Sequence, residues 1–251
     1  MNRLIVRLAS LGFIMPATGG AQASQEWPIH SRQRPQPAVV EPGTETLPVP
    51  APKDAIILFN GTDLSKWVHP KGEPARWLVR DGYFEVRPDA GNLMTRDSFG
   101  DVQLHVEWST PNPPAGTSQD RGNSGVYLMN MYEVQVLDSY RNETYADGHA
   151  GALYGQFPPL VNASRPPGVW QSFDITFHGP RFDSSGSLLR PATVTVRHNG
   201  VLIQDNVTLS GPTAHYARPP YAAHPDKLPI MLQDHGHPVR YRNIWLREIR
   251  D

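Results

Sequence analysis

Apolar and polar residues alternate with a period of two along most of the chain. Residues 101–109, DVQLHVEWS, place four apolar side chains on one face and Gln103, His105 and Glu107 on the other. Residues 132–138, YEVQVLD, and residues 170–178, WQSFDITFH, continue the pattern. Alternation of this kind predicts β-strands that turn one face to a core and the other to a polar surrounding.

A hairpin and several shorter strands extend the same pattern. Residues 192–204, ATVTVRHNGVLIQ, hold Asn199-Gly200 between two strand-like runs, which is a strong hairpin signal. No segment shows a sustained period of 3.6 with helix caps. Ten to twelve strands separated by Gly/Pro turns predict an all-β fold, a β-sandwich of the jelly-roll type. The shorter strands are expected at residues 56–59, 77–80, 83–87, 125–129 and 230–233.

The first 23 residues have the pattern of an export signal. A positively charged start precedes a short apolar core at residues 8–17, and AQA at residues 21–23 matches an A-x-A cleavage site. The apolar core is shorter than the ~20 residues that a membrane span needs, and no later segment approaches that length. We therefore expect a signal peptide at residues 1–23 and a mature protein that is periplasmic or secreted, with no membrane span.

Residues 24–53 are rich in proline and polar residues and have no apolar period. We interpret this segment as a flexible or polyproline-like spacer, with an ordered arm that wraps the domain as the alternative. The folded domain is then expected at residues 54–251.

Composition excludes several classes of function. The chain has no cysteine, so disulfide frameworks, thiol nucleophiles and cysteine-ligated zinc are excluded. Its 23 basic and 24 acidic residues nearly balance, and no basic block is present. Nothing in this charge pattern indicates a nucleic acid or an anionic membrane as partner.

Six motifs occur in one order along residues 56–249. They are LFNGTDLSKW (58–67), GNSGVYL (122–128), YEVQVLDS (132–139), GALYG (151–155), RPPGVWQSFDI (165–175) and PIMLQDHGHPVRYRNI (229–244). Together they resemble the 3-keto-disaccharide hydrolase domain family. The resemblance implies a concanavalin-like jelly-roll fold and cleavage of glycosides whose sugar has first been oxidised at C3. The chain has no dinucleotide fingerprint, so a separate dehydrogenase would supply that oxidised sugar.

The implied substrate sets the chemistry that the site must supply. A ketone at C3 acidifies the C2 proton, so a base can remove it and the resulting enolate can expel the C1 substituent. This elimination needs one base, a donor or cation at the C3 oxygen and a proton source for the leaving group. Direct hydrolysis needs two carboxyl groups about 5–9 Å apart. We favour elimination, because the ketone is superfluous to direct displacement.

Three residues are the candidates for catalysis. Glu133 is the first choice for the base, and Glu107 is a second carboxylate on a polar strand face. His235 can titrate near neutrality, so it could protonate the leaving oxygen or hold the enolate. Each could instead belong to the solvated side of a half-wet sheet or to a turn. Gln103 and His105 fit that solvated side better, and His237 is a weaker candidate than His235.

Further polar residues in the motifs are candidates for substrate binding. Asn123 and Asp138 could instead form turns, Tyr154 could be a core aromatic, and Arg240 could form a surface ion pair. The candidates are Asn123, Gln135, Asp138, Tyr154, Gln233, Asp234 and Arg240.

The sequence leaves two questions about function open. His, Asp and Glu occur in these motifs without a fixed ligand spacing, so a divalent metal is possible and no other cofactor is predicted. The leading function is an enzyme acting on 3-keto-glycosides. The alternative is a non-catalytic carbohydrate-binding module of the cell envelope, which would depend on exposed aromatic residues and not on carboxylates.

Overall fold

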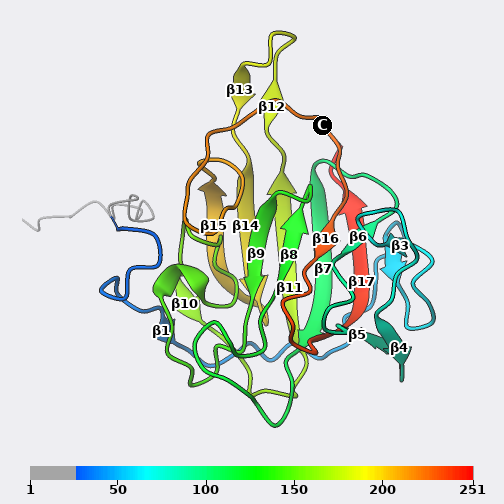
Figure 1. Cartoon of the computed structure of the whole chain (residues 1–251), viewed down its shortest axis with the longest axis vertical. Coiled ribbons are helices and arrows are strands. Elements are labelled where there is room, and N and C mark those ends of the chain that lie inside the picture. The colour runs from blue at the N-terminus through cyan, green and yellow to red at the C-terminus, as the bar shows by residue number, and fades with distance from the viewer. Residues whose placement is uncertain (1–26, 251) are drawn as a thin grey trace, which may run out of the picture.

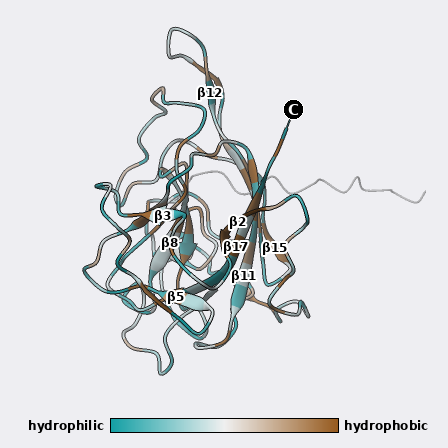
Figure 2. Cartoon of the chain, turned by 90° about the vertical axis from the view of Figure 1, so that its right-hand side faces the viewer, coloured by the Kyte–Doolittle hydropathy of each residue, from teal (hydrophilic) through white to brown (hydrophobic). Residues whose placement is uncertain are grey.

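Two antiparallel β-sheets stack face to face in the computed structural model, which describes residues 27–250. Figure 1 views the stacked sheets roughly face-on, and Figure 2 shows them edge-on, with β3 and β8 in one layer and β2, β11, β15 and β17 in the other. A short 3-10 turn, η1 (Ala146–Gly148), is the one helical element of these residues. The predicted all-β, concanavalin-like jelly-roll sandwich is confirmed. The predicted signal peptide lies outside the described residues.

The larger sheet runs in the order β15-β14-β11-β7-β17-β5-β4, with β2 paired to the far end of β17. Its strands are β15 (Val201–Thr208), β14 (Thr193–His198), β11 (Gln171–His178), β7 (Val102–Ser109), β17 (Arg240–Glu248), β5 (Tyr83–Glu85), β4 (Leu78–Arg80) and β2 (Ile56–Phe59).

The smaller sheet runs in the order β3-β6-β16-β8-β9. Two minor pairs complete the fold: a parallel pair of β1 with β10, and the β12–β13 hairpin that projects from one end (Figure 1). These strands are β3 (Trp67–Val68), β6 (Leu93–Thr95), β16 (Met231–Leu232), β8 (Ser124–Leu128), β9 (Tyr132–Val136), β1 (Ala38–Val39), β10 (Val161–Asn162), β12 (Arg181–Phe182) and β13 (Leu188–Arg190).

The core fills the space between the two sheets, and the alternation along each strand decides which side chains enter it. The four apolar residues of β7 are each at most 2% exposed, and they join one cluster with the apolar residues of β8, β9 and β11. Burial of each such side chain contributes about 1.5–3 kcal/mol. The core residues of these four strands are Val102, Leu104, Val106, Trp108, Val126, Leu128, Tyr132, Val134, Val136, Phe173, Ile175 and Phe177.

The predicted hairpin forms where Asn199-Gly200 connects β14 to β15. Both residues have positive φ, 51° at Asn199 and 79° at Gly200, which is the conformation that a tight two-residue hairpin turn requires. Strand number is the larger difference from prediction. The described residues form seventeen strands, and most of the strands that sequence analysis missed have two or three residues. A strand of two or three residues is too short to show an alternation of apolar and polar side chains.

Residues 27–53 form an ordered arm along the domain, so the flexible-spacer interpretation is wrong for them. The strand β1 pairs with β10, Gly43 N donates to Asn199 O at 2.8 Å, and Val49 N donates to Glu107 Oε1 at 2.8 Å. The arm packs through backbone groups and single polar side chains, such as Gln36 on His149 and Glu45 on Ser172, and not through an alternating apolar face, which is why its sequence shows no period. The folded unit therefore includes residues before 54.

The described part of the chain, residues 27–250, contains no helix with the length and hydrophobicity of a transmembrane span.

Candidate active site

A polar pocket of about 220 Å³ lies on the smaller sheet, on the side opposite the core. Glu133 and Gln135 of β9 and Tyr127 of β8 form its floor, because they alternate with the core residues of the same strands. A loop lies along the edge of β9, where Thr213 N donates to Met131 O and Thr213 Oγ1 accepts from Glu133 N. The lining residues are Asn123, Tyr127, Glu133, Gln135, Tyr154, Thr213, Ala214, His215, Gln233 and His235.

Glu133 is the only carboxyl group among the described residues that line this pocket, and it is only 4% exposed. Burial raises its pKa to about 8, against the opposing effect of a hydrogen bond from the Tyr127 hydroxyl. The missing side chain of Gly125 leaves room for the Glu133 carboxyl group, because a Cβ at position 125 would lie 2.5 Å from Glu133 Oε1. A carboxyl group held in this way is a base whose proton comes off near neutral pH.

Amide side chains surround the carboxyl group. The Gln135 amide lies 3.1 Å from Glu133 Oε1 and 2.9 Å from Ser124 O, so it donates to both when its nitrogen faces them. Gln233 donates to the Tyr127 hydroxyl at 3.3 Å, and Asn123 donates to Gln119 O at 2.8 Å. The buried oxygens of these last two amides, Gln233 Oε1 and Asn123 Oδ1, have no hydrogen-bond partner within residues 27–250. Each can accept a hydrogen bond from a ligand hydroxyl.

Two histidines and a tyrosine complete the pocket wall. Burial lowers the pKa of His235, so its ring is neutral near pH 7, and it lies parallel to the ring of His237. Tyr154 contacts His215 Nδ1 through its hydroxyl at 3.1 Å. Burial raises the pKa of Tyr154 to about 12, so this hydroxyl keeps its proton. The wall therefore offers neutral hydrogen-bonding groups around a single acid.

The structure brings six of the ten predicted site residues into this pocket. They are Asn123, Glu133, Gln135, Tyr154, Gln233 and His235. Sequence analysis missed four lining residues: Tyr127, Thr213, Ala214 and His215. Tyr127 lies in the GNSGVYL motif, two positions from Gly125, so alternation could have placed it beside Glu133. The other three lie in a loop without a period, and no pattern identifies them.

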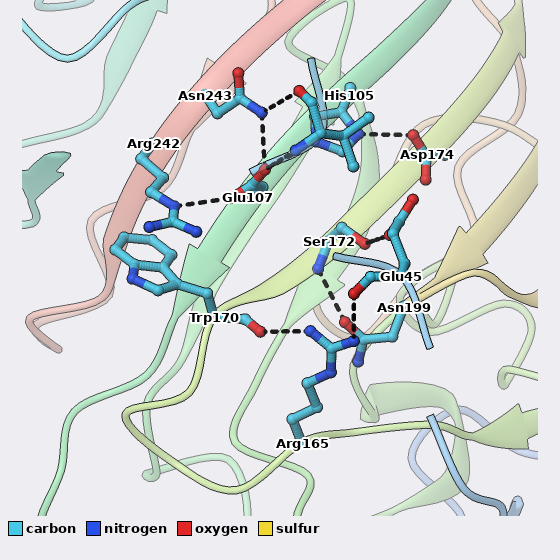
Figure 3. Close-up of polar contacts among 11 residues, drawn as sticks. Glu45, His105, Glu107, Arg165, Trp170, Ser172, Asp174, Asn199, Arg242 and Asn243 are labelled. Atoms are coloured by element: carbon cyan, nitrogen blue, oxygen red, sulfur yellow. Dashed lines mark hydrogen bonds and ion pairs between the residues drawn. The ribbon is translucent and has the colours of Figure 1, made fainter. Parts of the chain in front are cut away.

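Glu107 does not belong to the pocket, which corrects its prediction as a catalytic residue. It lies on β7, on the outer face of the larger sheet, where the arm covers it (Figure 3). Arg242 Nε lies 2.7 Å from Glu107 Oε2, and Asn243 Nδ2 lies 2.7 Å from Oε1. Burial raises the pKa of this carboxyl, but the hydrogen bonds from His105, Asn243 and Arg242 outweigh burial and lower it. A fully paired, unexposed carboxylate of this kind is structural.

His105 is fully buried, so the prediction that it lies on the solvated face of a sheet is wrong. Its Nδ1 lies 2.7 Å from Asp174 Oδ1 and its Nε2 lies 3.5 Å from Glu107 Oε1. Burial lowers its pKa, but the two carboxylates outweigh burial and raise it to about 9. The Trp245 ring stacks on the imidazole at 4.8 Å. This protonated histidine ties β7 to β11 (Figure 3).

Three further predicted binding residues lie outside the pocket and hold the fold. Asp138 pairs with Arg121 Nε at 2.8 Å. Asp234 accepts from Gly91 N and Gly236 N, both at 3.0 Å, and so shapes the loop that carries His235. Arg240 pairs with Glu85 at 2.7 Å.

No group of three or more His, Asp and Glu side chains in residues 27–250 is arranged to hold a metal ion. A divalent metal stays a prediction.

Comparison with known proteins gives the chain a family. The 3-keto-alpha-glucoside-1,2-lyase-like domain matches residues 54–247. A proposed glycosyl hydrolase from Parabacteroides distasonis is 46% identical, with a TM-score of 0.79 over 86% of this chain and 93% of that one. A second from the same organism is 19% identical, with a TM-score of 0.57 over 78% of this chain and 94% of that one, and shares the fold. Curated proteins include no match. The chain belongs to the 3-keto-alpha-glucoside-1,2-lyase-like domain family, which is a family of carbohydrate-active proteins.

Proposed function

We propose that the chain is an exported enzyme that cleaves 3-keto-glycosides by elimination, with Glu133 as the base. Membership of the family makes a 3-keto-α-glucoside the first substrate to consider. The predicted signal peptide favours a place of action outside the cytoplasm.

The single carboxyl group in the pocket is the observation that carries this proposal. Direct hydrolysis by two carboxyl groups needs a second acid about 5–9 Å from the first. Glu133 has no such partner among the described lining residues, and Glu107 lies on the outer face of the other sheet. Elimination needs one base, and a base is most effective when its pKa is close to the working pH. The value of about 8 for Glu133 meets that condition.

The proposed reaction proceeds in two steps. Glu133 takes the C2 proton, and the electrons of the broken C2–H bond form an enolate with the C3 carbonyl. The ketone then re-forms as a C1–C2 double bond develops, the C1–O bond breaks, and the leaving oxygen takes the proton that Glu133 now carries. The neutral His235 ring donates a hydrogen bond to the C3 oxygen while the enolate exists. Water adds to the double bond afterwards to give the free 3-keto-sugar, so the net result is hydrolysis.

The amide oxygens of the pocket suit the recognition of a sugar. Asn123 Oδ1 and Gln233 Oε1 are buried acceptors without a partner in the described residues, and leaving such an atom unpaired costs about 1–3 kcal/mol. A sugar hydroxyl that donates to either atom removes that cost. The pocket's polar frame therefore favours a polyhydroxylated ligand.

The test is incubation of the purified protein with 3-keto-trehalose in deuterated water, with products followed by mass spectrometry and NMR. Elimination followed by hydration places deuterium at C2 of the released keto-sugar, beyond the exchange that the keto-sugar undergoes alone. Glu133→Gln keeps the shape of the side chain and removes the base, so turnover should fall by ~10²–10⁴.

Glu143→Gln is the matched control, because Glu143 is an exposed carboxylate outside the pocket, and its turnover should equal that of the wild type. Full turnover by the Glu133 variant, without excess deuterium at C2, would refute both the base and the route. Tight binding of the substrate without any turnover would support the carbohydrate-binding module instead.

A further inference from the structure

The first residues of the arm lie against the wall of the pocket. The His30 ring stacks on the Tyr145 ring, with centroids 4.0 Å apart and planes at 27°. It also lies 5.1 Å from the Tyr154 ring and 5.2 Å from the His215 ring, and both of these residues line the pocket. His30 therefore contacts the pocket wall from behind.

A chain of hydrogen bonds runs from this stack to the pocket. The Tyr145 and Tyr154 hydroxyls lie 2.7 Å apart, and the Tyr154 hydroxyl lies 3.1 Å from His215 Nδ1. The two distances fit a chain in which Tyr145 donates to Tyr154 and Tyr154 donates to His215 Nδ1. Each tyrosine has one proton to give, so in this chain His215 carries its own proton on Nε2. Such a chain keeps His215 as a hydrogen-bond donor with one defined tautomer.

Two polar contacts fix the arm at this place. His30 N donates to the buried Asp147 Oδ2 at 3.1 Å. Arg218 donates to Trp27 O of the arm at 3.4 Å and to Gly155 O at 3.1 Å. Arg218 thus connects the arm to the two loops that carry His215 and Tyr154.

We propose that residues 27–34 of the arm are part of the active site, and that His30 is a positioning residue for Tyr154 and His215. These residues precede the family match, which begins at residue 54. The ring of His30 holds Tyr145, Tyr145 orients the Tyr154 hydroxyl, and Tyr154 sets the tautomer of His215. His30 does not line the pocket, so it acts on the substrate only through these groups. The effect on turnover rests on the proposed function, whereas the effect on His215 does not.

The test compares two variants of the full chain that differ only in the aromatic ring. His30→Leu fills the site with an apolar side chain but has no planar face to stack on Tyr145, and His30→Phe keeps that face. With 3-keto-trehalose, His30→Leu should lower kcat about tenfold, within the range that misplaced catalytic groups cost, with KM changed less than threefold. His30→Phe should stay within threefold of the wild type. Val39→Ala changes an exposed arm residue, 81% exposed, and should leave kcat unchanged.

NMR of protein labelled with ¹⁵N in histidine provides a readout that does not depend on turnover. The His215 signals, assigned with His215→Gln, should show the Nε2–H tautomer in the wild type and in His30→Phe, and a tautomer mixture in His30→Leu. Should the wild type fail to cleave the substrate, these spectra still decide the role of His30. Equal kcat and equal His215 spectra for the Leu and Phe variants would overturn the proposal.

Discussion

At the scale of single residues, the pocket's chemistry depends on how Glu133 is surrounded. The same glutamate on the solvated side of a strand would titrate near 4.5 and would be a weak base at neutral pH. Burial in the pocket that Thr213 and His215 also line removes water from the carboxylate and raises its pKa to about 8.

The raised pKa of Glu133 predicts a pH profile. Because the carboxyl must lose its proton to act as the base, kcat/KM for a 3-keto-glycoside should rise with pH and level off above about 8. Initial rates between pH 6 and 9.5 test this in the wild type, with the residual rate of Glu133→Gln as the baseline. A flat profile across this range would show that the base is not a group with the raised pKa of Glu133.

Gly125 predicts a second effect at this scale. An alanine Cβ there would lie 2.5 Å from Glu133 Oε1 and 2.8 Å from Tyr127 Cε2, so the carboxyl group must move. We expect Gly125→Ala to lower kcat/KM by at least about tenfold with a small change in stability, because flexible side chains yield. Gly72→Ala is the control: its Cβ meets nothing within 4 Å but its φ is +80°, so stability should fall and kcat/KM should not. The reverse pattern in the two variants would contradict this explanation.

At the scale of elements, β7 shows how one strand serves two environments. Its apolar face fills the core, and its polar face carries a buried network with Asp174 of β11 and Arg242 and Asn243 of β17 (Figure 3). The register of β17 shifts between residues 242 and 245, and Asn243 has a φ of 46° there. A bulge of this kind redirects a side chain, and here it brings the Asn243 amide to Glu107.

The polar face of β7 predicts that stability depends on pH. Two carboxylates raise the pKa of His105 from 6.5 to about 9 in the folded state, so the folded protein binds this proton more tightly than the unfolded chain does. The contribution is fully present below pH 6.5 and is lost as pH rises through 9. It should amount to about 3 kcal/mol of unfolding free energy.

Urea unfolding at pH 6.5 and pH 9.5 measures this loss, with His105→Gln as the reference for all other titrating groups. The wild type should lose more unfolding free energy between the two pH values than the variant does. An equal loss in both proteins would rule out the protonated histidine.

At the scale of the whole molecule, the arm joins regions that are far apart in the sequence. It starts beside the pocket wall at His30, pairs with β10, and ends over Glu107 on the outer face of the larger sheet. Figure 1 shows its first part at one side of the sandwich, next to β10. One extended segment therefore supports both the candidate active site and the buried ion pairs of β7.

Removal of the arm should destabilise the domain. A chain that begins at residue 54 loses the Val49 N–H that donates to Glu107 and exposes the polar network beneath, so the unfolding free energy should fall by about 2–5 kcal/mol. Unfolding curves of the full and shortened chains measure this, and Glu45→Ala, which loses only the contact to Ser172, should cost about 1 kcal/mol. Coincident curves for the full and shortened chains would mean that the arm contributes nothing.

The sequence by itself determined the longer strands, the hairpin and the polar faces of β7 and β9. A period of two is a local property, because successive side chains must point to opposite sides of a strand. It therefore predicted that Glu133 and Gln135 share a face. The motifs also indicated the family, because their residues and their order are properties of the sequence alone.

Tertiary structure alone decided which polar face became a pocket. Alternation cannot tell which sheet a strand joins or what covers its outer side, so Glu107 was a catalytic candidate beside Glu133 although the two lie on opposite outer faces of the sandwich. The arm and charged side chains contact Glu107, whereas a loop and neutral amides surround Glu133. That difference in partners, made by residues far away in the sequence, holds the pKa of Glu107 low and raises that of Glu133.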